Sequence, residues 1–201
     1  MDKLDFKDDT ELYRPPSDHF VEVEVPEFSF LMIDGEGAPE GAAYQSAMEA
    51  LYSLSYGIKF ASKVRLRRDY VVSPLEGLWW TDAPGNFAGT PRGQWRWSAL
   101  IRQPDWIGVS LVEECRARAL PKVPRAAEVR FGRWREGRSV QIMHVGSYAD
   151  EAPTIALLHQ EYLPQHGLIE NGRHHEIYLG DPRRTAPERL RTVIRQPVRS
   201  L

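Results

Sequence analysis

The feature that most constrains the fold of this chain is a set of short segments that recur in the same order in both halves. Ile101-Arg-Gln-Pro104 in the first half returns as Ile194-Arg-Gln-Pro197 in the second. Met32-Ile-Asp-Gly35 aligns with Met143-His-Val-Gly146, and each segment precedes a predicted helix. One match of four residues can arise by chance, but ordered matches on a shared strand–helix–strand–strand plan favour an internal duplication.

A third match concerns two glutamates. Leu75-Glu-Gly-Leu78 aligns with His175-Glu-Ile-Tyr178, so Glu76 of the first half corresponds to Glu176 of the second. Each repeat, a small sheet with a helix on one face, would bury little apolar surface alone. Pairing the two sheets makes a larger core and leaves a cleft where they meet, which is a common place for a ligand.

Hydrophobic spacing and turn residues predict the individual elements. Strands are predicted at 20–25, 28–33, 70–80, 94–101, 128–134, 139–145, 174–179 and 190–194, and helices at 44–63, 104–120 and 152–163. We expect an α+β fold with a first repeat at about residues 19–124 and a second at about residues 125–201. Residues 1–18 are charged and contain Pro15-Pro16, so we expect them to form a flexible N-terminal arm.

The net charge and the single cysteine limit the kinds of function and cellular location that we expect. The 201 residues carry a formal net charge of −2, so we expect neither direct nucleic-acid binding nor attraction to an anionic membrane. No apolar run approaches the roughly 20 residues that span a bilayer, and the charged N-terminus does not resemble a signal peptide. The single cysteine, Cys115, cannot form an intramolecular disulfide and is expected to be buried. We therefore expect a cytoplasmic protein.

Glutamates within aromatic strands indicate a pocket. Side chains alternate along a strand, so Glu76 shares a side with Trp80, and Glu176 shares the matching side of the other repeat with Tyr178. An unpaired buried carboxylate is costly, and such a group can have a raised pKa and act as a general acid or base. It can also attract a cation inside an aromatic cage. The alternative is a structural carboxylate that pairs with Arg or His, or one that faces solvent.

Aromatic side chains are numerous enough to wall a flat pocket. The candidates are Tyr44, Tyr70, Trp79, Trp80, Trp95, Trp97, Tyr148 and Tyr178. Packing in the core is the alternative for each of them. Tyr148 differs because it lies in a Gly-Ser-Tyr loop at the start of a helix, where its hydroxyl should be accessible.

Several common cofactor motifs are absent from the sequence. His174 and His175 are adjacent on a strand, so they face opposite sides and do not chelate a metal together, and neither HExxH nor a cysteine pair is present. The Gly-rich loop that begins at Asp34 lacks the Lys-Ser/Thr of a phosphate-binding loop, and no Gly-x-Ser-x-Gly nucleophile elbow occurs. We therefore expect no metal and no cofactor.

Four longer segments resemble the stand-alone branch of the GyrI-like small-molecule-binding proteins. They are Tyr70–Trp80, His144–Tyr148, His174–Arg184 and Thr192–Val198. The resemblance covers residues 19–201. It implies a tandem duplication of an SHS2-type β-α-β-β module, which forms one pseudo-twofold domain with a central ligand cleft.

The resemblance also implies a ligand class. Some relatives bind lipophilic, often cationic drugs beside a buried glutamate, and stand-alone members include hydrolases that open the strained cyclopropane of DNA-alkylating antibiotics. The family's strand glutamate corresponds to Glu176, and the tyrosine of its His-x-Gly-x-Tyr segment corresponds to Tyr148. The residues that we expect to bind a hydrophobic aromatic molecule are Tyr44, Tyr70, Glu76, Trp80, Trp97 and Tyr178.

Two functions from different classes follow. In the first, an enzyme, Glu176 takes a proton from water that attacks the cyclopropane, and Tyr148 or Tyr70 donates a hydrogen bond to the oxygen that gains charge. In the second, a non-catalytic binder or sensor of lipophilic and possibly cationic drugs, Glu176 is only a counter-ion. A pocket packed shut by its own aromatics is a third possibility.

Overall fold

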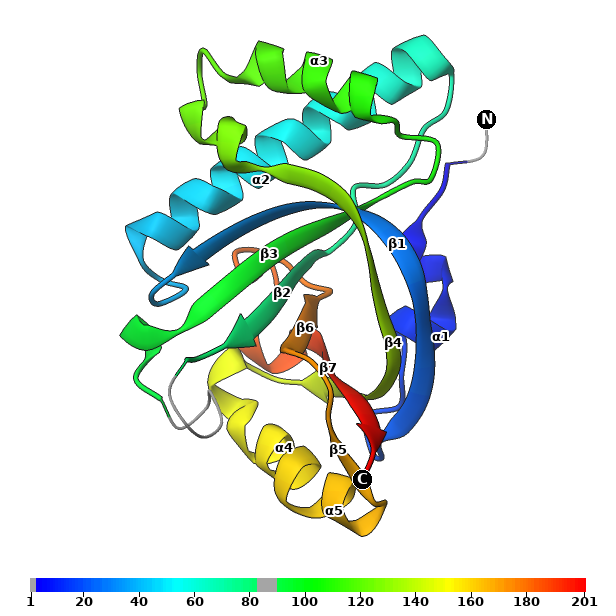
Figure 1. Cartoon of the computed structure of the whole chain (residues 1–201), viewed down its shortest axis with the longest axis vertical. Helices are drawn as coiled ribbons and strands as arrows, with labels where there is room; N and C mark the ends of the chain where they lie inside the picture. The colour runs from blue at the N-terminus through cyan, green and yellow to red at the C-terminus, as the bar shows by residue number, and fades with distance from the viewer. Residues whose placement is uncertain (1–2, 83–89) are drawn as a thin grey trace. The chain divides into compact units, whose positions relative to one another are not determined.

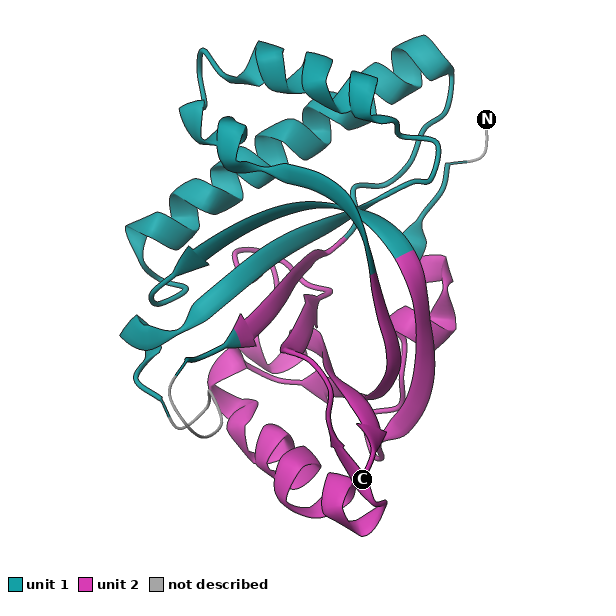
Figure 2. Ribbon diagram, in the orientation of Figure 1, with its two compact units in different colours: residues 1–6, 28–73, 80–134 teal, residues 7–27, 74–79, 135–201 magenta. Residues whose placement is uncertain are grey.

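The computed structural model describes residues 3–82 and 90–201, which form a mixed α/β fold in two compact units (Figures 1 and 2). Unit 1 comprises Met1–Phe6, Phe28–Ser73 and Trp80–Trp134. Unit 2 comprises Lys7–Glu27, Pro74–Trp79 and Arg135–Leu201. Each unit is therefore assembled from segments of both halves of the chain, although the predicted repeats divide it near residue 124.

Unit 1 is built on an antiparallel strand pair and a pair of helices. β1 (Val21–Glu36) pairs with β3 (Arg96–Gln103) through its unit 1 residues. α2 (Ala42–Ala61) packs against β3 and against α3 (Val109–Ala119), and the two helices lie side by side in Figure 1. The buried side chains of α2 recur at helical spacing, which explains the helix: Ala47, Ala50, Leu51, Leu54, Ser55 and Ile58. Shorter elements are the π-helical turn Ser62–Leu66 and the 3₁₀ turns Arg92–Gln94 and Pro124–Glu128.

Unit 2 contains an antiparallel sheet whose central strands are β6 (His174–Tyr178) and β7 (Arg191–Ser200). β2 (Leu75–Trp80) pairs with β6 on the side away from β7. β4 (Arg130–Val145) and β5 (Leu168–Glu170) both pair with β7. The remaining elements are the 3₁₀ turns Tyr148–Asp150 and Pro187–Arg189 and one helical run, which consists of α4 (Ala152–Leu157), the π-helical turn Leu158–Tyr162 and α5 (Leu163–Gln165).

The N-terminal segment is folded, with residues 3–6 in unit 1 and residues 7–18 in unit 2, which does not fit the flexible arm predicted for residues 1–18. It forms a 3₁₀ turn at Phe6–Asp8 and the short helix α1 (Thr10–Tyr13), whose Leu12 and Tyr13 are buried. The backbone N–H of Met143 donates to the carbonyl of Pro16 at 2.9 Å. Apolar side chains are sparse in this part of the sequence, but the buried Leu12 and Tyr13 anchor residues 7–18 in unit 2.

Other predicted elements are confirmed with changed bounds. The strands predicted at 20–25 and 28–33 form the single 16-residue strand β1, and those predicted at 128–134 and 139–145 form the 16-residue strand β4. The strand predicted at 70–80 begins only at Leu75, because Pro74 has no N–H to donate to a neighbouring strand.

The packing of Trp97 on Gly35 gives a test of the unit 1 core. Gly35 lies opposite Trp97 in the β1–β3 pair, and a Cβ at position 35 would overlap the indole ring. We expect Gly35→Ala to lower the free energy of unfolding by about 1–3 kcal/mol in urea titrations, because the core is already filled. Gly93→Ala, whose added Cβ would meet nothing within 4 Å, is the control. Equal stability of the two variants would contradict this packing.

Candidate functional site

The β2–β6 strand pair sends the two predicted glutamates to opposite faces of the unit 2 sheet. Glu176 lies opposite Gly77, whereas Glu76 lies opposite Ile177. Residues that are directly opposite share a face and side chains alternate along each strand, so the two carboxylates project in opposite directions. We call these two surfaces the Glu176 face and the Glu76 face. The expectation that both glutamates line one pocket does not hold within this sheet.

On the Glu176 face, hydrogen bonds fix the orientation of the Glu176 carboxylate. The Tyr178 hydroxyl donates to Glu176 Oε2 at 2.7 Å, and His174 Nε2 lies 3.2 Å from Glu176 Oε1. The indole N–H of Trp79 donates to the Tyr178 oxygen at 2.9 Å. Each bond orients the next, so Trp79 and Tyr178 together present Glu176 as an acceptor. Tyr178 was predicted as a ligand contact, and the structure brings it directly to the glutamate.

Gly77 provides the room for this arrangement. A Cβ at Gly77 would lie 2.7 Å from Trp79 Nε1 and 3.1 Å from the Tyr178 oxygen. The glycine therefore allows the indole and the phenol to meet over the strand, directly across from Glu176. This requirement explains why a glycine occupies a strand interior, where it otherwise weakens the sheet.

Tyr148 lies at the margin of the Glu176 face. Its ring packs edge-on against Tyr178, with 5.5 Å between the ring centroids, and the residue remains 37% exposed. The loop that carries it is tied down by Ser147, whose hydroxyl donates to Asp150 at 2.7 Å and whose carbonyl lies 3.1 Å from His144 Nε2. Tyr178 thus contacts both predicted catalytic residues, Glu176 through its hydroxyl and Tyr148 through its ring.

Glu151 belongs to the same surroundings and was missed by the sequence prediction. It directly precedes α4 and is only 4% exposed. Burial, and then the negative charge of Glu176, raise the pKa of Glu151 to about 9, so this carboxyl keeps its proton at neutral pH. In the sequence it looks like an ordinary acidic residue at a helix start. Only the tertiary fold shows that it is buried.

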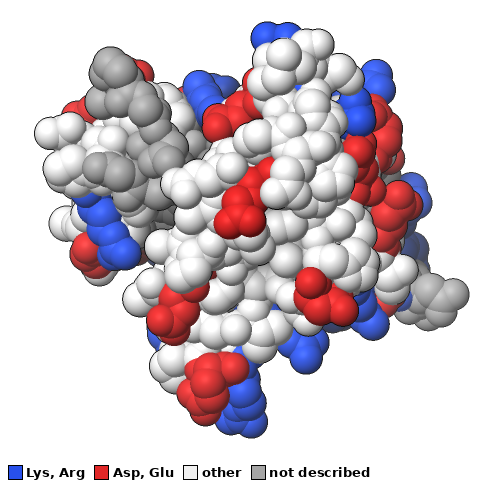
Figure 3. Space-filling view, turned by 90° about the horizontal axis from the view of Figure 1, so that it is seen from below, with Lys and Arg blue, Asp and Glu red and all other residues white. Residues whose placement is uncertain are grey.

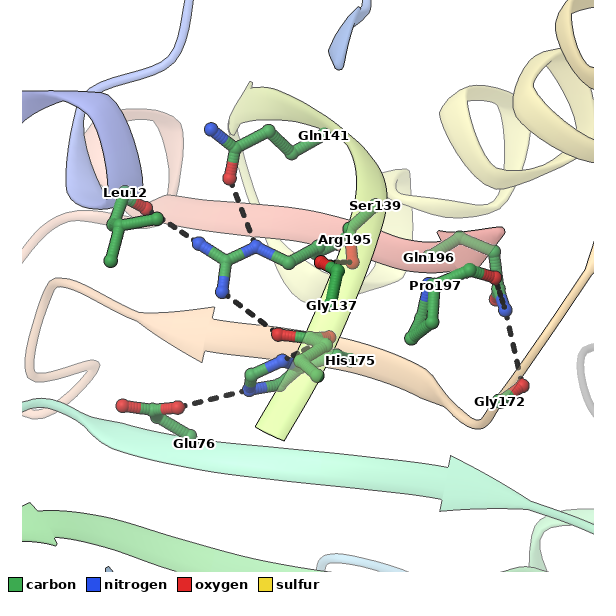
Figure 4. Close-up of polar contacts among 11 residues, drawn as sticks. Leu12, Glu76, Gly137, Ser139, Gln141, Gly172, His175, Arg195, Gln196 and Pro197 are labelled. Carbon is green, nitrogen blue, oxygen red and sulfur yellow. Dashed lines mark hydrogen bonds and ion pairs between the residues drawn. The ribbon is translucent and has the colours of Figure 1, made fainter. Parts of the chain in front are cut away.

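On the Glu76 face, a chain of buried polar contacts connects five elements: β2, β6, β4, β7 and α1 (Figure 4). His175 lies between two carboxylates, with its Nε2 3.0 Å from Glu76 Oε2 and its Nδ1 2.9 Å from Glu136 Oε1. Arg195 Nη1 donates to Glu136 Oε2 at 3.0 Å. The rest of this guanidinium donates to Gln141 Oε1 at 2.9 Å and to the backbone carbonyl of Leu12 at 2.8 Å.

The charges of this network balance. Burial alone lowers the pKa of His175, but the charges and hydrogen bonds of Glu136 and Glu76 outweigh it and raise that pKa to about 9. Burial alone raises the pKa of Glu136, but His175 and Arg195 outweigh it and hold that pKa below its ordinary value. Two carboxylates therefore face two cations. Glu76 is therefore a buried carboxylate that pairs with a histidine, which is the structural role named above as the alternative to ligand binding.

The other predicted ligand-binding aromatics belong to unit 1. Trp97 and Tyr70 are fully buried, and the Tyr70 hydroxyl donates to Gln103 Oε1 at 3.1 Å. Tyr44 packs edge-on against Trp97, with ring centroids 5.0 Å apart. Trp80 is half-buried at the end of β2. Trp97 and Tyr70 are therefore core residues. Because the Tyr70 hydroxyl is buried and already donates to Gln103, it is not suited to donate a hydrogen bond to a ligand.

The described residues contain no cluster of metal ligands and no helix that could span a membrane. Among them, no group of three or more His, Cys, Asp or Glu side chains is arranged to hold a metal ion. No helix in the described ranges has the length and apolar character needed to cross a bilayer. On the face shown in Figure 3, Lys and Arg side chains lie among Asp and Glu side chains.

Comparison with known proteins identifies the family of this chain. The family model of the GyrI-like small molecule binding domain matches residues 19–199. The chain belongs to the GyrI-like family. No curated protein matches this GyrI-like chain.

Solved structures agree with the family. A conserved protein from Listeria innocua is 38% identical, with a TM-score of 0.89. Two structures described as hydrolases from Listeria innocua are 38% and 36% identical, with TM-scores of 0.83 and 0.86. Each comparison covers 98% of this chain and 100% of the other. The Glu176 face is therefore part of a GyrI-like small-molecule-binding domain.

The Glu76 face gives a stability test in this GyrI-like domain. Glu136→Gln should lower the free energy of unfolding by about 3–5 kcal/mol, because it leaves two buried cations with one carboxylate fewer. Glu24→Gln is the matched control, since Glu24 meets Arg135 at 2.7 Å in a solvent-exposed pair that should contribute less than about 1 kcal/mol. Urea titration of both variants measures the difference. A Glu136→Gln protein as stable as the control would show that the buried network contributes little.

Proposed function

We propose that this GyrI-like domain binds a flat, hydrophobic aromatic small molecule on the Glu176 face and hydrolyses a strained cyclopropane within it. The observation that carries the proposal is the Glu176 carboxylate, which Tyr178 holds as an acceptor beside the partly exposed Tyr148. Support also comes from the two hydrolases from Listeria innocua, which align over their whole length.

The proposed chemistry needs a base and a hydrogen-bond donor. Glu176 takes a proton from water, and the water oxygen bonds to the cyclopropane carbon as the strained carbon–carbon bond breaks. The electron pair of that bond moves to a conjugated carbonyl oxygen, to which the Tyr148 hydroxyl donates a hydrogen bond. Tyr178 bonds to Oε2 of Glu176 and His174 contacts Oε1, and each oxygen keeps a further lone pair that can accept the proton.

The duplication and the cellular role belong to the same proposal. The long strands β1 and β4, each of 16 residues, occupy corresponding places in repeats at about residues 19–124 and 125–201. This correspondence supports a tandem pair of SHS2-type modules in one pseudo-twofold domain over residues 19–201. Opening a DNA-alkylating cyclopropane would make the protein a cytoplasmic detoxifying enzyme that confers drug resistance.

A second function is supported by the aromatic rings around Glu176. Tyr178 bonds to the carboxylate and Tyr148 packs against the Tyr178 ring, while the indole N–H of Trp79 donates to the Tyr178 oxygen. Ring faces and a carboxylate together suit a lipophilic cation, for which Glu176 would be a counter-ion without a chemical role. The domain would then sequester or sense drugs.

Two single substitutions distinguish the hydrolase from the non-catalytic binder. Incubation with a spirocyclopropyl dienone should give the water-added, ring-opened product, detected by mass spectrometry. Glu176→Gln should lower kcat/KM by about 10²–10⁴-fold through loss of the base. Tyr148→Phe should lower it by about 10²–10³-fold through loss of the donor.

The control is Glu161→Gln, which alters an exposed carboxylate of the helical run and should leave turnover unchanged. Compound bound without product, with binding lost in Glu176→Gln, would support the binder instead. Turnover by Glu176→Gln at the wild-type rate would refute the assignment of the base.

A further inference from the structure

Three aromatic side chains form a row along the surface of α2, and we call them the α2 aromatic row. Tyr52, Tyr56 and Phe60 are spaced four residues apart, so they follow one another along one side of the helix. Their rings stack in sequence, with centroids 6.3 Å apart for Tyr52 and Tyr56 and 6.4 Å apart for Tyr56 and Phe60. Tyr56 is 47% exposed and Phe60 is 58% exposed.

The α2 aromatic row lies opposite the face by which α2 packs into unit 1. An α-helix turns by about 100° per residue, which places Tyr56 on the side away from the buried Leu51, Leu54 and Ile58. Val64, in the π-helical turn after α2, is also exposed and lengthens the apolar surface. Exposed apolar side chains that adjoin one another in this way are typical of a surface that meets another molecule.

The charges at the two ends of the row have opposite signs. Glu49, which is exposed, lies about one turn before Tyr52, and Lys63 lies about one turn after Phe60. Lys63 Nζ lies 3.4 Å from Asp69 Oδ2, but its side chain stays 58% exposed and can reach a second carboxylate. The outward side of α2 therefore runs from negative to positive along the chain.

We propose that the α2 aromatic row is a homodimer interface, where α2 of a second copy of this chain packs antiparallel across a twofold axis at Tyr56. Glu49 and Lys63 are each seven residues from Tyr56, so the twofold axis brings Glu49 of one copy opposite Lys63 of the other. The same axis brings Tyr52 towards Phe60 and Tyr56 towards its own counterpart. A parallel arrangement would instead place like charges together.

This self-complementary pattern favours a second copy over other occupants. An interface with twofold symmetry requires one surface to match itself, with every contact made twice. The row meets this requirement with both its aromatic and its charged residues. It also has the usual composition of an interface, an aromatic centre with charged groups at its rim. An anionic membrane would attract Lys63 but repel Glu49.

The size of the surface indicates a weak, reversible dimer. α2 has 20 residues and is about 30 Å long, and one such helix from each copy gives a small interface. Interfaces that bury less than about 1,200 Å² are typical of transient complexes, so we expect a dissociation constant of about 10–100 µM. Because α2 belongs to unit 1, this inference does not depend on the function proposed for the Glu176 face of unit 2.

Sedimentation velocity of the full chain at about 5–500 µM tests the dimer, since this range brackets the expected dissociation constant. Wild type should change from monomer to dimer as its concentration rises. Tyr56→Glu removes the central ring and sets two carboxylates against each other at the axis, so it should raise the dissociation constant at least about tenfold. Leu157→Glu is the control, because Leu157 is 44% exposed at the end of α4 in unit 2, and it should dimerise as wild type does.

Exchanging the two charges tests the antiparallel pairing. Glu49→Lys and Lys63→Glu, each made alone, should raise the dissociation constant about three- to tenfold, because each sets like charges opposite each other twice in the dimer. The double variant that carries both changes should return to within about twofold of wild type, since opposite charges then face each other again. Melting curves of the variants at low concentration check that each monomer is folded.

Three results would overturn the proposal. They are a wild-type chain that stays monomeric over the whole concentration range, a Tyr56→Glu protein that dimerises as strongly as wild type, and a double variant that dimerises no better than either single one. Binding of wild-type monomer to vesicles of phosphatidylserine and phosphatidylcholine, lost in Tyr56→Glu, would assign the row to a membrane surface instead.

Discussion

The unit 2 sheet depends on one constraint: β6 is buried on both faces, and its polar side chains must find partners on each. His175 turns to the Glu76 face, where Glu76 and Glu136 enclose it. Glu176 turns to the other face, where Tyr178 and His174 contact it. Strand alternation thus separates a balanced network of charges from a carboxylate that is available for chemistry.

The two faces differ in how completely their charges are compensated. On the Glu76 face, Arg195 bonds to three residues on two elements, β4 and α1, and neutralises Glu136 together with His175. Such a network is costly to break and holds the N-terminal segment against the sheet through the carbonyl of Leu12. On the Glu176 face, two carboxyls share a site whose surroundings favour only one negative charge, which is why Glu151 keeps a proton. A charge-balanced network therefore lies on one face of the sheet, and the Glu176 carboxylate lies on the other.

Sequence patterns predicted β6, the shared side of Glu176 and Tyr178, and an accessible Tyr148, because each depends on local periodicity or on a loop motif. The repeat also predicted that Glu76 and Glu176 share one side, and the strand pairing does not place them so. In the antiparallel pair Glu76 lies opposite Ile177 rather than Glu176, and an offset of one residue moves a side chain to the other face. Glu151 could not be found in this way, since its burial comes from contacts between segments that are distant in the chain.

The central claim is that ligands meet the Glu176 face and not the Glu76 face. A crystal structure of the wild-type protein with the ring-opened product of a spirocyclopropyl dienone tests it most directly. The account predicts that the new hydroxyl of the product lies at Glu176 and that its phenol oxygen accepts a hydrogen bond from the Tyr148 hydroxyl. Product bound against Glu76 and His175, with their network broken, would contradict it.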